Sequence, residues 1–460
     1  MGVYRSVITS FAAGLLLAPL LSTVVAPPAQ AAPAAAASPD YDRDGHADLA
    51  AVLIGSDETA TIRVWYGSGD VQEITHTQLG IAAQGIGWGI GYTLLARDLD
   101  GDGYTDLVAT STSESGARVH LIRGTGSGLR PADAVSFPVS STARSHTTAL
   151  ALVESPVRRL AVGVTTYVKT NPDWLQQEEV RLYPLSAAGN PSGNPIVLKP
   201  GSGKLPKLSK NADFGWGLAS WGSQLFVAAP EAKVNGKAGA GAVVAVTLDG
   251  KGVKSARSIT QSTKGVTGTA DRHDYFGKAI AARDGYLVVG TPNDHVGKLK
   301  DTGSVQVFSL SKGAVKPVKR ISQASSGVPG KAERYDRFGS AVAIGTACGG
   351  VPAVLVGGPG EVVSTSDSDG AAWLIPLRKA AGCKATQLWE GHGLPGKPGT
   401  RGIGGLVGFV RDGAGVTDDL VIGGYGSASQ GPLSRLFRIS GSTGGTLLNE
   451  ESIFDGIAGR

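Results

Sequence analysis

The stretch DLDGDGYTD, from Asp98 to Asp106, decides how the rest of this sequence is interpreted. Counted as loop positions 1 to 9, it has carboxylates at positions 1, 3, 5 and 9 and a glycine at position 6. Alternating carboxylates can converge on one hard cation, because the glycine lets the backbone turn sharply around it. The apolar segment LVAT follows, so the loop runs into a predicted β-strand. The sequence therefore predicts a calcium site built from Asp98, Asp100, Asp102, Tyr104 at position 7, and Asp106.

The same pattern occurs earlier, in DYDRDGHAD. The predicted metal residues of this copy are Asp40, Asp42, Asp44, His46 and Asp48. An EF-hand would need a glutamate at position 12 and flanking helices, whereas position 12 is Ala51 in one copy and Ala109 in the other. Two complete matches in a chain with only 18% charged residues favour Ca²⁺ over the alternative, a pair of acidic surface turns without metal.

The N-terminal residues 1–31 have the pattern of a secretory signal peptide. Arg5 is their only charge, an apolar run extends from Phe11 to Leu21, and Ala29-Gln30-Ala31 supplies the small residues of a cleavage site. Residues 32–39 are rich in Ala and Pro and are interpreted as a flexible leader, and residues 40–460 as one domain. The sequence thus predicts a secreted, extracellular protein without a membrane span.

The composition favours β-structure. The 460 residues include 68 glycines and a single methionine, which makes a helical protein improbable. The net charge of +5 is spread thinly, and the densest basic run comprises Lys199, Lys204, Lys207 and Lys210 among Gly, Pro and Ser. A solvated loop is favoured here over a site for an acidic partner.

One unit of about 60 residues recurs along the chain, which is the length of a four-stranded propeller blade. Each copy has an apolar core strand, and these cores begin at Asp48, Asp106, Arg159, Gln224, Tyr286, Ala353 and Asp419. A small-residue inner strand precedes every core except the first, and two further segments of rising polarity follow it. The C-terminal tail from Ser452 repeats the inner-strand pattern. We therefore predict an all-β fold, a seven-bladed β-propeller of four-stranded antiparallel blades closed by the C-terminal tail.

These motifs resemble FG-GAP repeats. The resemblance rests on the Phe-Gly pairs at Phe214, Phe276 and Phe338, on the DxDxDGxxDL loops, and on the closing AAP, GTP and GGP segments that end at Pro230, Pro292 and Pro359. Such repeats build the seven-bladed propeller of integrin α subunits and occur in many secreted bacterial proteins. The resemblance implies a propeller and calcium. Only the first two copies keep the complete acidic loop, so calcium is expected in two blades, and nothing indicates an integrin β partner.

Two cysteines in an exported chain suggest one disulfide, between Cys348 and Cys383. The strand assignment places Cys348 in the loop from the inner strand to the core strand of blade six. It places Cys383 in the loop from the third to the fourth strand of the same blade. Both loops would emerge on one face, which is also the face of the predicted calcium loops, leaving the other face for partners.

Catalytic motifs are absent from the sequence. It contains no GxSxG, no HExxH and no cysteine-rich zinc pattern, and its seven histidines are scattered over different blades. Among the tryptophans, Trp88, Trp216 and Trp221 lie in or beside inner strands, so we expect them to pack between blades. Trp174 lies in a polar insertion and is the candidate exposed aromatic contact.

The sequence therefore predicts a calcium-stabilised, non-catalytic binding propeller. We expect a monomer that recognises an extracellular protein or glycan and does not bind nucleic acid. The alternative is a secreted propeller hydrolase or lyase with its site in the central channel. The inner strands are mostly Gly, Ala, Val and Ile, which argues against that alternative.

Overall fold

The structure of the protein is a computed structural model. The structure describes residues 38–458 except 55–59, 82–88, 114–115, 143, 171–173, 312, 365–368, 397–401, 412–416, 425–434, 441–443 and 450–451. The predicted signal peptide and most of the predicted leader lie outside these residues. Ser38, which was assigned to the leader, exchanges two backbone hydrogen bonds of 2.9 Å with Arg411. No helix among the described residues is long and apolar enough to cross a membrane.

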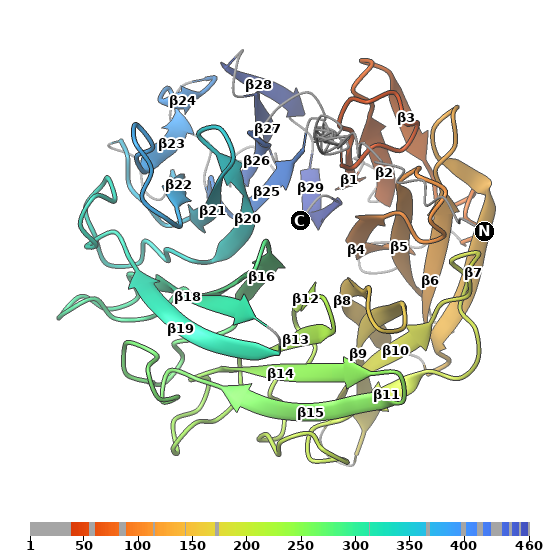
Figure 1. The fold of residues 1–460 in the computed structure, drawn as a ribbon, viewed down its shortest axis with the longest axis horizontal. Coiled ribbons are helices and arrows are strands. Elements are labelled where there is room, and N and C mark those ends of the chain that lie inside the picture. Colours follow the sequence, from red (N-terminus) through yellow and green to blue (C-terminus); the bar gives the residue numbers. More distant parts are fainter. Residues whose placement is uncertain are drawn as a thin grey trace, which may run out of the picture. The chain divides into compact units, whose positions relative to one another are not determined.

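The described strands form seven sheets, one for each predicted blade, arranged as a propeller (Figure 1). We call the strands of a blade A to D, from the inner edge of the sheet outward.

Blade one contains β29 (Ser452–Ala458), β1 (Leu49–Ile54), β2 (Ala60–Trp65) and β3 (Val71–Ile74). Blade two contains β4 (Gly89–Arg97), β5 (Asp106–Ser113), β6 (Gly116–Arg123) and β7 (Arg130–Ser140). Blade three contains β8 (Ser145–Val153), β9 (Arg159–Lys169), β10 (Trp174–Pro184) and β11 (Ile196–Leu198). Blade four contains β12 (Leu218–Trp221), β13 (Gln224–Ala229), β14 (Ala242–Asp249) and β15 (Gly252–Ile259).

Blade five contains β16 (Ala279–Arg283), β17 (Tyr286–Thr291), β18 (Ser304–Ser311) and β19 (Ala314–Ile321). Blade six contains β20 (Ala341–Ala347), β21 (Val351–Gly358), β22 (Ala371–Pro376), β23 (Thr386–Glu390) and a fifth, short strand β24 (Gly393–Leu394). Blade seven contains β25 (Leu406–Val410), β26 (Asp419–Gly424), β27 (Arg435–Ser440) and β28 (Gly444–Asn449). All pairings within the blades are antiparallel except that of β23 with β24, which is parallel and extends blade six beyond the predicted four strands.

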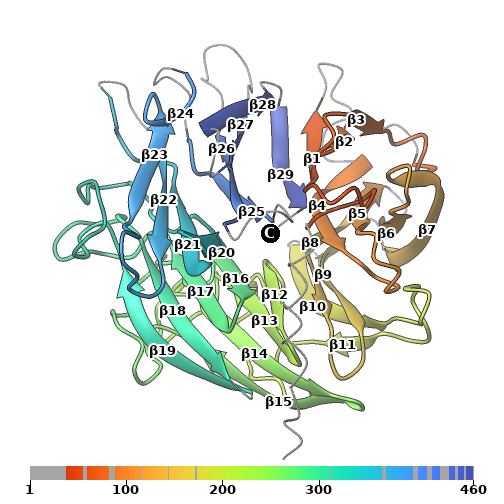
Figure 2. The same cartoon turned by 45° about the horizontal axis from the view of Figure 1, so that its top comes forward.

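The predicted closure by the C-terminal tail is confirmed. β29 pairs antiparallel with β1, with Ala50 opposite Ala458 and Leu53 opposite Ile453 (Figure 2). The first blade thus takes its inner strand from the end of the chain and its other three strands from the beginning. This pairing covers an edge of β1 that would otherwise present unpaired backbone groups.

The apolar core is divided among the junctions between neighbouring blades. In β1, Leu49, Ala51 and Leu53 pack against blade seven. The alternate residues Ala50 and Val52 pack against blade two. Successive side chains of a strand point to opposite faces of its sheet, and here both faces are covered by another blade. The core strands are therefore apolar throughout, which explains why they read as continuous hydrophobic runs.

The Phe-Gly motif fixes the contact between successive blades. Phe276 and Phe338 are fully buried. A Cβ added at Gly241 would lie 2.3 Å from the Phe276 carbonyl oxygen, and one added at Gly303 would lie 2.1 Å from that of Phe338. Both glycines also have positive φ, 85° and 84°. A side chain at either position would therefore force the blades apart.

The predicted disulfide is confirmed. Cys348 and Cys383 are bonded, with their Cα atoms 5.7 Å apart. Cys348 lies between β20 and β21 and Cys383 between β22 and β23, so the bridge joins two loops of blade six as predicted.

Candidate metal centre

The loop of residues 40–48 leads into β1 and is held by its own carboxylates. Asp42 Oδ1 accepts the N–H of Asp44, and Asp44 Oδ1 accepts the N–H of His46. Asp40 Oδ2 accepts the N–H of Gly45, whose φ of 89° suits glycine. Each of these carboxylates thus accepts a backbone N–H from a residue two or five positions later in the chain. Short Asp-rich loops stabilise tight turns in this way.

The loop of residues 98–106 joins β4 to β5 and repeats these bonds at corresponding positions. Asp100 Oδ1 accepts the N–H of Asp102, and Asp102 Oδ1 accepts the N–H of Tyr104. Asp98 Oδ2 accepts the N–H of Gly103, whose φ is 91°. The shared sequence pattern therefore produces the same local conformation in two blades.

The aspartates at position 9 anchor both loops to the third strand of their blades. Asp48 accepts N–H groups from Tyr41, at 2.6 Å, and from Gly67, at 2.8 Å. Asp106 accepts the corresponding N–H groups from Leu99, at 2.9 Å, and Gly124, at 3.0 Å. Both aspartates are fully buried.

In each loop the carboxylates at positions 1, 3 and 9 come together. One oxygen from each of Asp40, Asp42 and Asp48 lies within 4.8 Å of the others, and the same holds for Asp98, Asp100 and Asp106. Asp40 Oδ1 is buried and has no hydrogen-bond partner. Burial raises the pKa of Asp48 to about 7, and Asp42 and Asp40 act in the same direction, whereas the N–H groups of Tyr41 and Gly67 oppose it. A site of clustered oxygen ligands with an unsatisfied buried oxygen suits a hard divalent cation.

The remaining predicted metal residues lie at the surface of the loops. The side chains of Asp44, Asp102 and His46 are exposed and outside the two convergent groups. The Tyr104 ring lies 5.6 Å from the guanidinium carbon of Arg43. Position 7 of such loops contributes a backbone carbonyl, so the side chains of His46 and Tyr104 need not face the ion.

The two acidic loops contact each other directly. The Asp40 N–H donates to Thr105 Oγ1 at 3.0 Å, and the Thr105 N–H donates to the Asp40 carbonyl oxygen at 2.9 Å. Arg43 Nη1 donates to the Asp102 carbonyl oxygen at 3.3 Å. A residue that would hold the first ion is thus hydrogen-bonded to the loop that would hold the second, across the junction of blades one and two.

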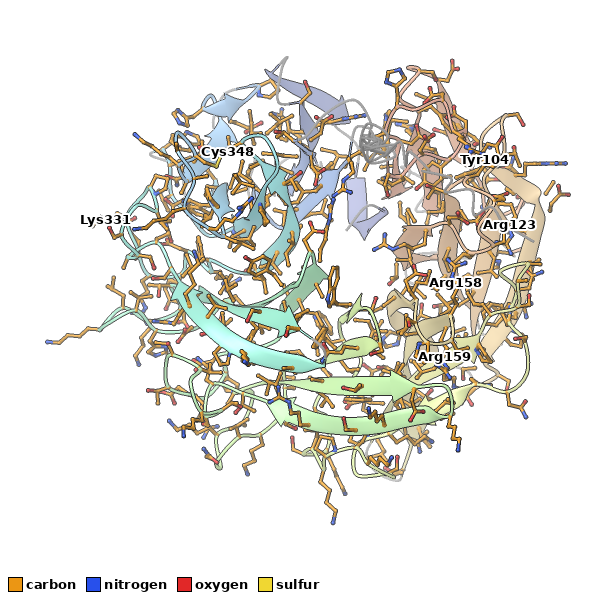
Figure 3. All side chains as sticks on the ribbon, in the orientation of Figure 1. Tyr104, Arg123, Arg158, Arg159, Lys331 and Cys348 are labelled. Atoms are coloured by element: carbon orange, nitrogen blue, oxygen red, sulfur yellow. A yellow bond between two sulfur atoms is a disulfide. The ribbon has the colours of Figure 1, made fainter. Side chains whose placement is uncertain are left out.

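Arg123 is a residue of the site that the sequence did not indicate. It ends β6, and its Nη1 lies 2.7 Å from Asp106 Oδ2 and 3.7 Å from Asp100 Oδ2. Figure 3 shows it on blade two with Tyr104. In blade one the corresponding residue is Tyr66, which precedes Gly67, so the neutral Tyr66 stands where the second loop has an arginine paired with its position-9 aspartate. No local motif distinguishes Arg123 from other strand-end arginines.

Blade three also contacts the second loop. Arg158, which precedes β9, donates from Nη1 to the Leu99 carbonyl oxygen at 2.9 Å and from Nη2 to that of Asp98 (Figure 3). The second loop is therefore supported from both neighbouring blades.

Charged groups also lie where inner strands end. Arg283 ends β16 and lies 3.0 Å from Asp418, which in turn lies 3.3 Å from Arg411. The N–H of Thr346 donates to the same Asp418 carboxylate. The mostly apolar inner strands thus end in an ionic cluster that the sequence did not predict, and its carboxylate is fully engaged.

The tryptophan expectation holds in part. Trp216 contacts the next blade, because its Nε1 donates to the Lys278 carbonyl oxygen at 3.0 Å and the Lys278 ammonium lies 3.5 Å from its ring centroid. Trp216 and Trp221 are nevertheless 39% exposed each, more than a packing role alone predicts. Trp88 and the Trp174 side chain lie outside the described residues.

Comparison with known proteins agrees with this architecture. By its fold, the chain is a seven-bladed β-propeller. It carries an FG-GAP repeat, because the FG-GAP repeat family model matches residues 90–128, which include the second acidic loop. No curated protein matches the chain.

The solved structures that match the chain share little sequence with it. A putative 6-phosphogluconolactonase from Bacteroides fragilis NCTC 9343 has 10% identity and a TM-score of 0.47, with 90% of this chain and 98% of that chain covered. A putative 6-phosphogluconolactonase from Bacteroides uniformis ATCC 8492 has 12% identity and a TM-score of 0.46, with the same coverage. The WD40 domain of SCAP from fission yeast has 10% identity and a TM-score of 0.39, with 86% and 88% covered.

Proposed function

We propose that this protein is a calcium-stabilised, non-catalytic propeller that binds a protein or glycan outside the cell. The observation that carries the calcium proposal is the convergence of three carboxylates in each of two loops that are hydrogen-bonded to each other. The disulfide and the FG-GAP repeat support an extracellular location.

Calcium would neutralise carboxylates that the fold holds close together. Asp40, Asp42 and Asp48 would hold one ion, and Asp98, Asp100 and Asp106 the other, with the carbonyl groups of His46 and Tyr104 as further candidate ligands. Because the loops lie at the junction of the first two blades, bound calcium would stabilise the part of the ring beside its closure. We expect a structural role, since these carboxylates already support the backbone.

A binding role is favoured over catalysis by the chemistry of the inner strands. The ionic cluster of Arg283, Arg411 and Asp418 is internally paired, so it offers no available acid or base. A screen with generic esterase, phosphatase and glycoside substrates tests the alternative. Turnover that is lost in the Arg283→Gln variant while the variant remains folded would favour a channel enzyme.

Thermal unfolding with calcium and with chelator tests the calcium proposal. An ion at about 100 times its dissociation constant adds roughly 2.7 kcal/mol per site, so chelation should lower the melting temperature. Asp42→Ala and Asp100→Ala should each remove part of this response. Asp133→Ala is the matched control, because Asp133 is an exposed blade-two carboxylate that pairs with Arg130. Identical melting curves of the native protein with and without calcium would refute the proposal.

A further inference from the structure

A continuous basic surface lies at the opposite ends of the blades from the acidic loops. We call it the basic face and define it by residues 199–217, 230–241, 260–278, 292–303 and 322–340, all of which the structure describes. These segments join strand D of one blade to strand A of the next, or strand B to strand C within blades four and five. In an up-and-down blade such loops emerge opposite the A-to-B loops, where residues 98–106 lie.

Hydrogen bonds connect these segments into one surface. The Lys233 N–H donates to Ser209 Oγ at 2.9 Å, and the Tyr275 N–H donates to the Gly239 carbonyl oxygen at 2.9 Å. Further along, the Phe338 N–H donates to the Thr302 carbonyl oxygen at 2.9 Å. The D-to-A loops that follow β15 and β19 are therefore attached to the B-to-C loop of the preceding blade, and the loop that follows β11 is attached to the B-to-C loop of the blade it enters. The surface extends without interruption over blades four and five and the segments that flank them.

The exposed charges of the basic face are predominantly positive. Of its eight acids, Asp274, Asp294 and Asp336 are buried, and Asp213, Glu231 and Asp301 are half-buried. The exposed acids Asp271 and Glu333 lie within 3.5 Å of lysine ammonium groups. Exposed cations without an ion pair in the described structure include Lys207, Lys210, Lys264, Arg272, Lys298 and Lys300. The basic run from Lys199 to Lys210, for which the sequence favours a solvated loop, thus lies at one end of a larger positive surface.

The backbone of the basic face is held in an unusual conformation. The residues three and one before each Phe-Gly motif have positive φ in three successive loops: Asn211 and Asp213, His273 and Tyr275, and Tyr335 and Arg337. Left-handed conformations are costly for residues with a side chain and persist only where the surrounding structure imposes them. The loops therefore present their side chains from fixed positions, which lowers the entropy cost of binding a partner.

Aromatic rings lie among the cations and are partly covered by them. Trp216 is 39% exposed and lies beneath Lys278, while Tyr335 is 50% exposed and has the Arg334 guanidinium carbon 4.7 Å from its ring centroid. Sequence-independent binding of single-stranded nucleic acid relies on free aromatic faces on which bases stack. Rings already covered by cations are less suited to that role.

We propose that the basic face binds an anionic polysaccharide, a chain that carries carboxylate or sulfate groups at regular intervals. The inference rests on the proposed binding function and specifies its partner class. The dispersed lysines match repeated, separated negative charges, and complementary charge accelerates and orients such association. Lys331, at the outer rim of the ring in Figure 3, lies on the same surface.

The proposal is tested by measuring how full-length, calcium-loaded protein binds two polyanions, dextran sulfate and polygalacturonate. Neutral dextran is the uncharged probe. We expect binding to both polyanions that weakens as salt concentration rises, and none to dextran. A triple variant should bind both polyanions with at least about tenfold lower affinity; it combines Lys210→Glu, Lys298→Glu and Lys300→Glu. The matched control combines Lys251→Glu, Lys379→Glu and Lys384→Glu, which reverse three charges in the C-to-D loops of blades four and six. It should leave affinity within about twofold.

Three results would overturn the proposal: no binding to either polyanion at low salt, equal losses in both triple variants, or tighter binding of DNA than of either polysaccharide. The calcium response of the melting temperature is measured on the same samples. If that response persists while polyanion binding fails, this surface assignment is wrong and the calcium-stabilised propeller stands. If the response is absent in the native protein, the calcium proposal fails independently of the basic face.

Discussion

Buried aspartates in this protein hold turns that lie between strands. Asp336 precedes the Phe338-Gly339 pair and is 1% exposed, and its Oδ2 accepts the N–H of Glu333. Burial raises its pKa to about 7, and the charges of Glu361 and Glu333 add to the effect, while the Glu333 N–H opposes it. The ionised form is therefore disfavoured in the folded state.

The pH dependence of stability should report Asp336. Its pKa is near 4 in the unfolded chain and about 7 in the folded protein. Between these values the folded state binds more protons, so the free energy of unfolding should fall as pH rises from about 4 to 7. Asp336→Asn should reduce this slope and make the variant more stable than the native protein at pH 8, by up to a few kcal/mol.

Urea unfolding at pH 5, 6, 7 and 8 in saturating calcium measures this slope. Asp133→Asn is the control, because it removes an exposed carboxylate of blade two and leaves Asp336 and its neighbours in place. Equal slopes in the native protein and Asp336→Asn would show that Asp336 is already charged in the folded protein at pH 5.

At the scale of elements, the loops of residues 40–48 and 98–106 behave as one unit. Thr105 accepts the Asp40 N–H through its hydroxyl and donates its own N–H to the Asp40 carbonyl oxygen. Gly124 allows this approach, because a Cβ there would lie 2.2 Å from the Thr105 carbonyl oxygen and 2.7 Å from that of Tyr41. Ordering one loop around an ion should therefore help to order the other.

Removing the Thr105 hydroxyl should weaken calcium binding in both loops. Thr105→Val would leave the buried Asp40 N–H without its acceptor, at a cost of about 1–3 kcal/mol. We expect a calcium isotherm with lower overall affinity and reduced coupling between the two ions. Thr105→Ser keeps the hydroxyl and should bind like the native protein. Calorimetric titration distinguishes these outcomes, and an unchanged isotherm in Thr105→Val would refute the coupling.

For the whole molecule, stability depends on closing the ring. The pairing of β29 with β1 joins the two ends of the propeller, and the apolar cluster between blades seven and one completes the circle of junctions. An open ring would expose the edge of β1, and exposed edges promote pairing with other chains.

Deleting Ser452–Arg460 should therefore destabilise the protein and cause association. We expect a fall in melting temperature on the order of 10 °C and a shift to oligomers in size-exclusion chromatography. Adding the peptide of residues 452–460 in trans should reverse both effects, which separates loss of the strand from general damage. A truncated protein that stays monomeric with the native melting temperature would contradict this account of closure.

The sequence by itself determined the features that depend on local chemistry. Strand alternation, the Phe-Gly turns and the spacing of aspartates around Gly45 and Gly103 are set by neighbouring residues. Counting strands from these signals was sufficient to predict seven blades, the closing role of the tail and the Cys348–Cys383 bridge. The disulfide followed because strand order in an up-and-down blade fixes which loops share a face.

Only the tertiary structure decided which distant residues meet. Arg123 reaches Asp106 from the far end of β6, and Thr105 bonds to Asp40 from 65 residues away. The basic face likewise exists only because successive blades place separate loops beside one another. The Arg123–Asp106 pair follows from the register of β5 with β6 inside blade two, where Leu107 lies opposite Ile122. The Thr105–Asp40 contact and the basic face depend on the packing angle and register between blades, which arise from many side chains acting together. No single segment of the sequence encodes them.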